Sequence, residues 1–306
     1  MSDRKLVTFD WALKRLLRSK ANFDILEGFL GSLFGRDVRI LEILESESNR
    51  ETALDRQNRV DLKVRDDGGE IVLVEIQYER ELDYLQRVLF GVSKVIVEHI
   101  GRGAPYAEVS RIVSVSILHF DLGRGEDYVY RGTTEFRGLH KNDELLLNVR
   151  QRKFYRKRRI SDIYPEYYLL KVNQFDDVAR DSLDEWIYFL KNGEIREGFR
   201  AKGLLKARRE LDVLRLSDGE RREYERFEED LHYRASMYET YYSDGEREGM
   251  KKGKEEGIRE GMEKGRHEER LRNAHNLLDV IDDATISRRM GIPLEEVEAL
   301  REKKGE

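Results

Sequence analysis

Asp61, Glu75 and Gln77 are the residues of this sequence whose types and spacing suit chemistry on a phosphodiester. One carboxylate lies in each half of residues 58–78, NRVDLKVRDDGGEIVLVEIQY, and the amide follows the second carboxylate by two residues. Mg²⁺ prefers oxygen ligands and keeps several waters, so one or two carboxylates plus substrate phosphate oxygens complete its shell. Such an ion activates a bound water and neutralises developing charge. We therefore expect Asp61 and Glu75 to form a Mg²⁺ (or other divalent-cation) site.

A β-hairpin is the element that must bring these side chains together. The first half of the stretch alternates hydrophobic and polar residues, and residues 71–76 are almost entirely aliphatic, so each half is predicted to be a strand. Between them, residues 66–69 are Asp-Asp-Gly-Gly, which tolerate the positive φ of a tight antiparallel turn. Because strand side chains alternate with period two, Glu75 and Gln77 project from one face of the second strand.

A hairpin that carries acidic residues on its solvated face fits the same pattern. The metal site is favoured by the setting of Glu75, which interrupts a run hydrophobic enough to be buried on both faces. A buried carboxylate is costly unless it is paired or bound to a metal.

The pattern D-x13-E-x-Q, formed by Val60-Asp61-Leu62-Lys63-Val64 and Val74-Glu75-Ile76-Gln77, resembles the PD-(D/E)XK nuclease superfamily. More narrowly, it resembles the Rpn branch, the recombination-promoting nucleases that are also described as transposases. The resemblance covers roughly residues 5–265. Three more segments support it: Phe9-Asp10-Trp11-Ala12-Leu13-Lys14, Gln86-Arg87 and Leu183-Asp184-Glu185-Trp186.

Two residues depart from the superfamily pattern. Val60 replaces the Pro before the Asp, and Gln77 replaces the usual Lys. An amide cannot carry a positive charge or act as a base, so Gln77 bears directly on activity. Glu-x-Gln does resemble the form found in the Rpn branch.

The resemblance implies a metal-dependent DNA endonuclease. The implied fold is α/β, a restriction-endonuclease-like mixed sheet flanked by helices, followed here by a helical C-terminal region. In this interpretation Asp61 and Glu75 hold Mg²⁺, the backbone carbonyl of Ile76 is a third ligand, and Gln77 orients the attacking water. The resemblance also implies a link to DNA recombination, mobile elements or phage defence.

Asp10, Lys14 and Arg87 are candidate accessory residues. Asp10 and Lys14 are one turn apart on the helix expected from residue 8 to residue 18, which by resemblance borders the active site. A surface ion pair between the two fits the spacing equally well. Arg87 belongs to the helix expected after the hairpin.

An alternative function is a non-catalytic DNA- or protein-binding regulatory protein that retains the nuclease fold. The amide at Gln77 supports this alternative. The helical C-terminal region would then act through homo-oligomerisation.

Composition narrows the functional class. The chain of 306 residues is long enough for one sizeable domain plus an accessory segment, and it contains no cysteine for a disulfide or a thiolate metal site. No apolar run reaches 18 residues, and the start lacks the hydrophobic core of a signal peptide, so we expect a cytoplasmic protein with no membrane partner. The net charge is −5, so contact with DNA must use a local basic patch.

Such a patch is present at residues 150–159, RQRKFYRKRR, with seven basic residues and no acidic one. This concentration favours phosphate binding, and the two aromatic residues can stack on an unpaired base. A solvated loop balanced by acidic neighbours is the alternative. The candidate DNA-contacting residues are Arg152, Lys153, Arg156, Lys157 and Arg158.

The hydrophobic pattern predicts the order of the nuclease core, a helix, three strands, a helix and another strand. Strands are expected at 38–44, 112–120, 128–136 and 145–149, in addition to the hairpin. A helix over 82–100 is expected to cover one face of the sheet with Leu82, Leu85, Leu89, Val92, Ile96 and Ile100.

The chain divides into a nuclease-like core at 1–175, a helical extension at 176–243, a charged spacer at 244–270 and a small helical tail at 271–306. Glycine recurs at every fourth position of the spacer. Each interior Gly costs a helix about 1 kcal/mol relative to Ala, so a flexible spacer is favoured over close packing against another chain. The tail is expected to turn at residues 290–292 and to be a protein-contact or packing unit, because its last helix is acidic and would repel phosphates.

Overall fold

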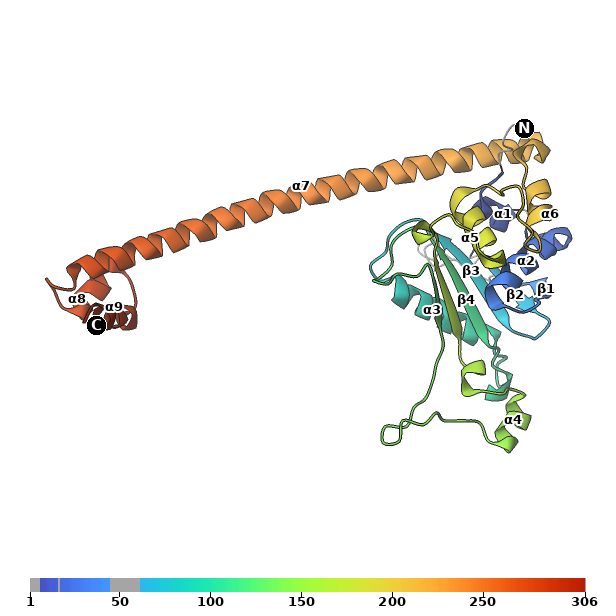
Figure 1. Cartoon of the computed structure of the whole chain (residues 1–306), viewed down its shortest axis with the longest axis horizontal. Helices are drawn as coiled ribbons and strands as arrows, with labels where there is room; N and C mark the ends of the chain where they lie inside the picture. Colours follow the sequence, from blue (N-terminus) through green and yellow to red (C-terminus); the bar gives the residue numbers. More distant parts are fainter. Residues whose placement is uncertain (1–5, 16, 45–60, 306) are drawn as a thin grey trace. The chain divides into compact units, whose positions relative to one another are not determined.

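One mixed sheet forms the centre of the fold, with its strands in the order β1-β2-β3-β4-β6-β5 (Figure 1). The computed structural model describes residues 6–15, 17–44 and 61–305. The strands are β1 (Ile40–Ile43), β2 (Leu62–Asp66), β3 (Ile71–Gln77), β4 (Ile112–Leu118), β5 (Val129–Gly132) and β6 (Glu166–Lys171). The chain separates into two units, Met1–Glu229, which contains the sheet, and Asp230–Glu306.

The predicted hairpin is confirmed. β2 and β3 pair antiparallel, with Leu62 opposite Val74. The turn between them is closed by Asp66, whose backbone carbonyl accepts a hydrogen bond from the amide of Gly69, and Gly69 has a φ of 76°. β3 pairs parallel with β4 after the crossover helix α3 (Tyr84–His99), so the sheet is mixed, as the sequence predicts. Val60, expected in the first strand, lies outside the described residues.

Both faces of β3 are covered. Val72, Val74 and Ile76 contribute to the main hydrophobic core, and Ile71 and Leu73 form a second cluster with residues of α3. The main core also includes side chains from α1 (Phe9–Arg15), α2 (Phe23–Phe34) and α5 (Ser182–Asn192). The predicted alternation therefore places Glu75 and Gln77 on the α3 side of the sheet.

The face of α3 that packs on the sheet agrees with the prediction only in part. Val92 is buried and Ile96 packs against the second cluster, as expected. Leu82, which precedes the helix, Leu85 and Leu89 were also expected to be buried but are 93%, 55% and 58% exposed. The buried residues of the helix are Tyr84, Val88, Val92 and Val95. These four also recur at three- and four-residue steps, so the helix has two apolar stripes and periodicity alone cannot choose between them.

The predicted strand at 145–149 is wrong. These residues run without regular structure into the short helix α4 (Val149–Tyr155), and the strand that completes the sheet is β6. β6 begins with Glu166 and ends with Lys171, and both are buried. Because its first and last residues are charged, this buried strand is not recognised from hydrophobic runs alone.

The core continues well past residue 175. Trp186 of α5 and Leu204 of α6 (Leu204–Glu210) are completely buried in the main core, so the boundary expected at 175 falls inside one packed unit. The two ends of this unit also meet, because the amide of Val7 donates a 2.8 Å hydrogen bond to the carbonyl oxygen of Leu211.

Residues 244–270 belong to the continuous helix α7 (Asp218–Leu277) and do not form the flexible spacer that was expected. Good helix-forming residues and i,i+4 pairs such as Glu248 and Lys252, 3.0 Å apart, support the helix despite its glycines. The predicted turn is confirmed, since Gly291 has a φ of 65° and ends α8 (Asp283–Met290) before α9 (Leu294–Gly305). None of the described helices is both long and apolar enough to span a membrane.

Gly28→Ala is expected to lower the free energy of unfolding by about 1–3 kcal/mol, because the added methyl group would overlap the carbonyl oxygen of Lys202. Urea unfolding measures the change. Gly91→Ala in α3 is the matched control, since its methyl group meets open space and gains helix propensity of up to about 1 kcal/mol. Equal stability of the two variants would contradict the close approach.

Candidate active site and basic pocket

Asp61 lies immediately before β2 and is fixed against the end of β3. Its Oδ2 accepts a 2.8 Å hydrogen bond from the amide of Ile76. Its Oδ1 lies 3.3 Å from the Nζ of Lys14, and its backbone carbonyl accepts a 3.1 Å hydrogen bond from Arg18. The carboxylate of Asp61 is therefore held beside the backbone of the residue that follows Glu75.

The helix α1 supplies a second carboxylate and a cation to the same place. Lys14 bridges Asp61 and Asp10, with its Nζ 2.6 Å from the Oδ1 of Asp10. Burial lowers the pKa of Lys14, but the charges of Asp61 and Asp10 outweigh this effect and hold the pKa above its ordinary value. The side chain of Asp10 is buried and that of Lys14 is 40% exposed, so the pair is partly buried.

Arg87 of α3 connects the remaining predicted residues. Its guanidinium donates hydrogen bonds to Glu75 Oε1 and to Glu81 Oε1, and it lies 3.4 Å from Gln77 Oε1. The amide nitrogen of Gln77 donates to the carboxylate of Glu81 at 3.0 Å. Of the three accessory residues, Asp10 and Lys14 are thus joined with Asp61, and Arg87 contacts Glu75 and Gln77.

Glu81 is a member of this group that the sequence reasoning missed. It lies in the loop between β3 and α3, where its carboxylate accepts from both Gln77 and Arg87. Burial raises its pKa, and the nearby charges of Asp83 and Glu79 add to the effect. A local signal could have identified Glu81, because it lies only four residues after Gln77, in an acidic turn that precedes a helix.

An aromatic pair lies next to the carboxylates. The rings of Tyr78 and His119 stack with centroids 4.3 Å apart and an angle of 16°, at the ends of the parallel strands β3 and β4. Burial lowers the pKa of His119 to about 4, so its ring is neutral at pH 7. Burial raises the pKa of Tyr78, and the charges of Asp10 and Asp61 raise it further, so its hydroxyl keeps its proton.

The donor set of the site suits a hard divalent cation. Asp61 and Glu75 supply carboxylate oxygens from adjacent strands, and Mg²⁺ needs only one or two protein carboxylates when waters and phosphate complete its shell. Among residues 6–15, 17–44 and 61–305, no three His, Asp or Glu side chains are grouped as metal ligands. Both carboxylates are paired with cations, so metal binding has to compete with Lys14 and Arg87.

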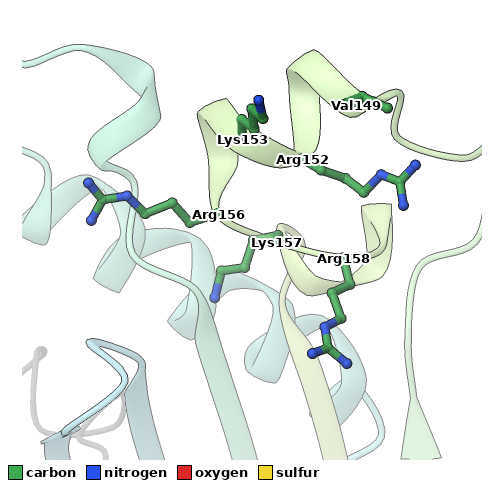
Figure 2. Close-up of a pocket in the computed structure, with 6 residues that line it drawn as sticks. All are labelled: Val149, Arg152, Lys153, Arg156, Lys157 and Arg158. Carbon is green, nitrogen blue, oxygen red and sulfur yellow. The ribbon is translucent and has the colours of Figure 1, made fainter.

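The basic patch forms a pocket of about 430 Å³ around α4 (Figure 2). Asn148 and Gln151 cap the start of this helix with reciprocal hydrogen bonds, and Arg156 ends it in the left-handed conformation. The pocket is lined by Val149 and by all five candidate DNA-contacting residues, Arg152, Lys153, Arg156, Lys157 and Arg158.

The pocket lies at the opposite end of β3 from the carboxylates. The Nζ of Lys157 is 3.6 Å from the carboxylate of Glu70, the residue before β3, whereas Glu75 lies five residues farther along. At about 3.3 Å per residue, this corresponds to about 17 Å along the strand. The structure therefore separates the basic patch from the predicted catalytic residues.

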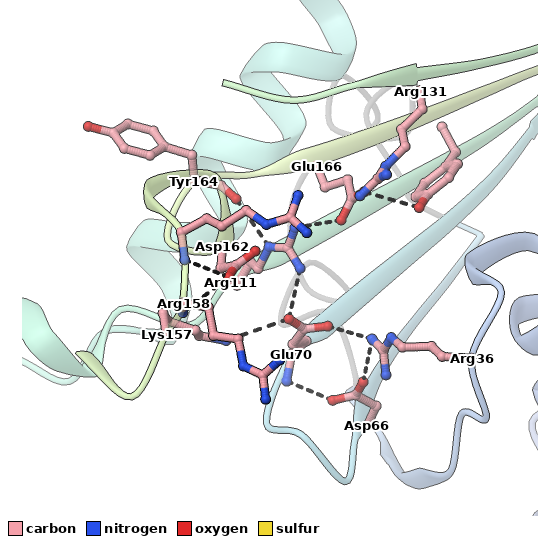
Figure 3. Close-up of polar contacts among 12 residues, drawn as sticks. Arg36, Asp66, Glu70, Arg111, Arg131, Lys157, Arg158, Asp162, Tyr164 and Glu166 are labelled. Atoms are coloured by element: carbon pink, nitrogen blue, oxygen red, sulfur yellow. Dashed lines mark hydrogen bonds and ion pairs between the residues drawn. The ribbon is translucent and has the colours of Figure 1, made fainter. Parts of the chain in front are cut away.

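A network of ion pairs fixes this end of the sheet (Figure 3). Glu70 contacts Arg36 at 2.6 Å and Arg111 at 3.0 Å, and Arg111 also contacts Glu166 at 2.5 Å. Arg131 of β5 also pairs with Glu166 of β6. These partners come from distant parts of the sequence, so no local pattern could have predicted the network.

The sheet order and the site at the end of β3 define a restriction-endonuclease-like α/β fold. A family model described as PD-(D/E)XK nuclease family transposase matches residues 7–240, so the chain belongs to that family. The family supports a nuclease-type function and implies a DNA substrate, and PD-(D/E)XK nucleases generally use divalent metal ions. No curated protein and no solved structure matches the chain.

The neutral, partly buried ring of His119 is expected to make stability depend on pH. Its pKa is about 4 in the folded protein, against about 6.5 when exposed, so between these values the unfolded chain binds more protons. The contribution of neutral His119 to the free energy of unfolding is therefore fully present above pH 6.5 and is lost as the pH falls toward 4. Urea unfolding at pH 7 and pH 4 should show wild type losing about 3 kcal/mol more than His119→Gln. Parallel losses would contradict this assignment.

Proposed function

We propose that this protein is a metal-dependent DNA endonuclease that hydrolyses phosphodiester bonds at the end of β3. The observation that carries the proposal is the hydrogen bond that holds the carboxylate of Asp61 against the amide of Ile76, the residue after Glu75, with Gln77 on the same side of the sheet as Glu75. Membership of the nuclease family supports it. A role in recombination, mobile elements or phage defence and a cytoplasmic location are inferred from the resemblance and composition.

In this proposal Asp61 and Glu75 hold the divalent cation. When bound, such an ion supplies charge neutralisation at the phosphate and an activated water. Gln77 has no charge to donate, so its contribution is to orient a water molecule through its amide. Glu81 fixes the amide by accepting a hydrogen bond from its nitrogen.

The superfamily pattern has a Lys at the position of Gln77. In this chain the positive charge of the site comes from Lys14 and Arg87 instead. They now neutralise Asp61 and Glu75. With a divalent cation bound to the two carboxylates, Lys14 and Arg87 would be free to contact phosphate oxygens. The raised pKa of Lys14 keeps it protonated near neutral pH, so its role is electrostatic and it does not act as a base.

Asp61→Asn and Glu75→Gln are each expected to lower the rate of supercoiled-plasmid cleavage by at least about 100-fold in Mg²⁺ or Mn²⁺, because each substitution removes a charged metal ligand. Gel analysis of nicked and linear products measures the rate. Asp67→Asn is the matched control, since it removes one charge from the exposed turn of the same hairpin. Equal cleavage by all four proteins would place the nuclease site elsewhere.

A second candidate is a binding or regulatory protein that retains the fold without catalysis, with homo-oligomerisation through the C-terminal helices. The observation that favours it is the amide at Gln77 together with carboxylates already paired with cations. A degenerate site would show no carboxylate-dependent metal affinity, which separates the two candidates.

Arg87→Met is expected to strengthen Mn²⁺ binding at least about threefold, because a unit charge beside a partly solvated site contributes on the order of 1 kcal/mol. Isothermal titration calorimetry measures the affinity. Arg80→Met, which removes an exposed charge from the loop between β3 and α3, should leave the affinity unchanged, and Asp61→Asn should abolish it. Mn²⁺ affinity that ignores both Arg87 and Asp61 would rule out this metal site.

A further inference from the structure

The α4 pocket concentrates positive charge that the protein itself leaves unbalanced. Lys157 pairs with Glu70, but the side chains of the other cations make no ion pair with any described residue. These unpaired cations are Arg152, Lys153, Arg156 and Arg158. In Figure 2 their charged ends point in different directions from the backbone that surrounds the pocket. A solvated basic loop balanced by acidic neighbours would not leave four cations unmatched.

Arg156 adds an independent observation. It has a φ of 54° at the end of α4, a left-handed conformation that favours Gly, Asn or Asp. The other described residues with positive φ, glycines aside, are Asn142 and Asp177, which are common in that conformation. A long cationic side chain at a position where glycine would be less strained is the kind of outlier found at binding sites.

The pocket is also anchored to the rigid end of the sheet. Lys157 is held by Glu70, and the amides of Arg158 and Arg159 donate to the carboxylate of Asp162 (Figure 3). Glu70 is held in turn by Arg36 and Arg111. The cations therefore extend from a backbone that the buried network fixes relative to β3.

We propose that the α4 pocket is a second contact for duplex DNA, which binds backbone phosphates about 17 Å along β3 from the carboxylates. The proposal rests on the proposed function in taking DNA as the substrate. Since each strand of duplex DNA carries one phosphate per 3.4 Å of helix axis, the separation corresponds to about five base pairs when the axis runs along β3. The pocket contributes affinity that does not depend on the metal, and cleavage takes place at the other end.

Binding of a fluorescein-labelled 20-base-pair duplex, followed by anisotropy in EDTA over a range of salt concentrations, tests the proposal without cleavage. The variant carries Arg152→Gln, Arg156→Gln and Arg158→Gln. The control carries Arg259→Gln, Arg266→Gln and Arg272→Gln, the same loss of charge at exposed positions of α7. The α4 variant is expected to bind at least about tenfold more weakly, and its salt dependence should fall by about 2.7 in slope, about 0.9 for each phosphate that is no longer neutralised.

Arg156→Gly separates charge from folding. It removes a cation and gives the end of α4 the residue that its backbone conformation favours, so the helix should be no less stable. Weaker binding by this variant, with unchanged or higher thermal stability, supports the proposal. Affinity equal to wild type in both α4 variants overturns it, as does wild type that fails to bind duplex DNA at low salt.

Cleavage measured separately in Mn²⁺ keeps the two proposals distinct. Wild type that binds through α4 but cuts no DNA would overturn the endonuclease and leave the pocket supported. Cleavage that is lost in Glu75→Gln, together with wild-type binding by the α4 variants, would overturn the pocket alone.

Discussion

The burial of β3 on both faces is the constraint on which the candidate site depends. A carboxylate that interrupts such a strand loses most of its contact with water, and the side chain of Glu75 keeps only 17% of its exposure. The cost of removing a charge from water is several kcal/mol unless a partner offsets it. Arg87 offsets it for Glu75, and Lys14 does so for Asp61 and Asp10.

The same constraint shapes the other end of the strand, with a different result. There Glu70 and Glu166 are buried, and Arg36, Arg111 and Arg131 surround them. This cluster is closed by several mutual ion pairs that connect β-strands, and it contacts Lys157 after α4. The carboxylates near Gln77 are each balanced by one cation, Asp61 by Lys14 from α1 and Glu75 by Arg87 from α3.

The parts of the fold that sequence reasoning predicted are those determined locally. The β2–β3 hairpin follows from alternation and from a turn of Asp and Gly, and both are read within 20 residues. The end of α2 is likewise local, because Gly35 adopts a left-handed conformation there, which glycine favours. That the helix with Lys14 borders the predicted site was expected only from family resemblance, and its contact with Asp61 was not predicted, because no pattern within either segment connects them.

The errors arise where tertiary contacts decide between locally equivalent options. The first half of α3 has two apolar stripes, and the one that packs on the fold contains Tyr84 and Val88, whereas Leu85 and Leu89 are exposed. β6 was missed because Glu166 became acceptable in a buried strand only through Arg111 and Arg131. The stacking of Tyr78 on His119 likewise depends on the parallel pairing of strands that are more than 30 residues apart.

The contact between the two ends of the first unit affects how the chain folds during synthesis. Val7 bonds to Leu211, and Leu6 forms a β-bridge with Asp212, so the N-terminal segment has no permanent partner until about 200 further residues have been made. The hydrophobic sides of α1 and α2 stay incompletely covered during that interval, when α5 and α6 are still missing. A nascent chain that stops before residue 212 therefore exposes apolar surface, which makes it a substrate for chaperones and proteases.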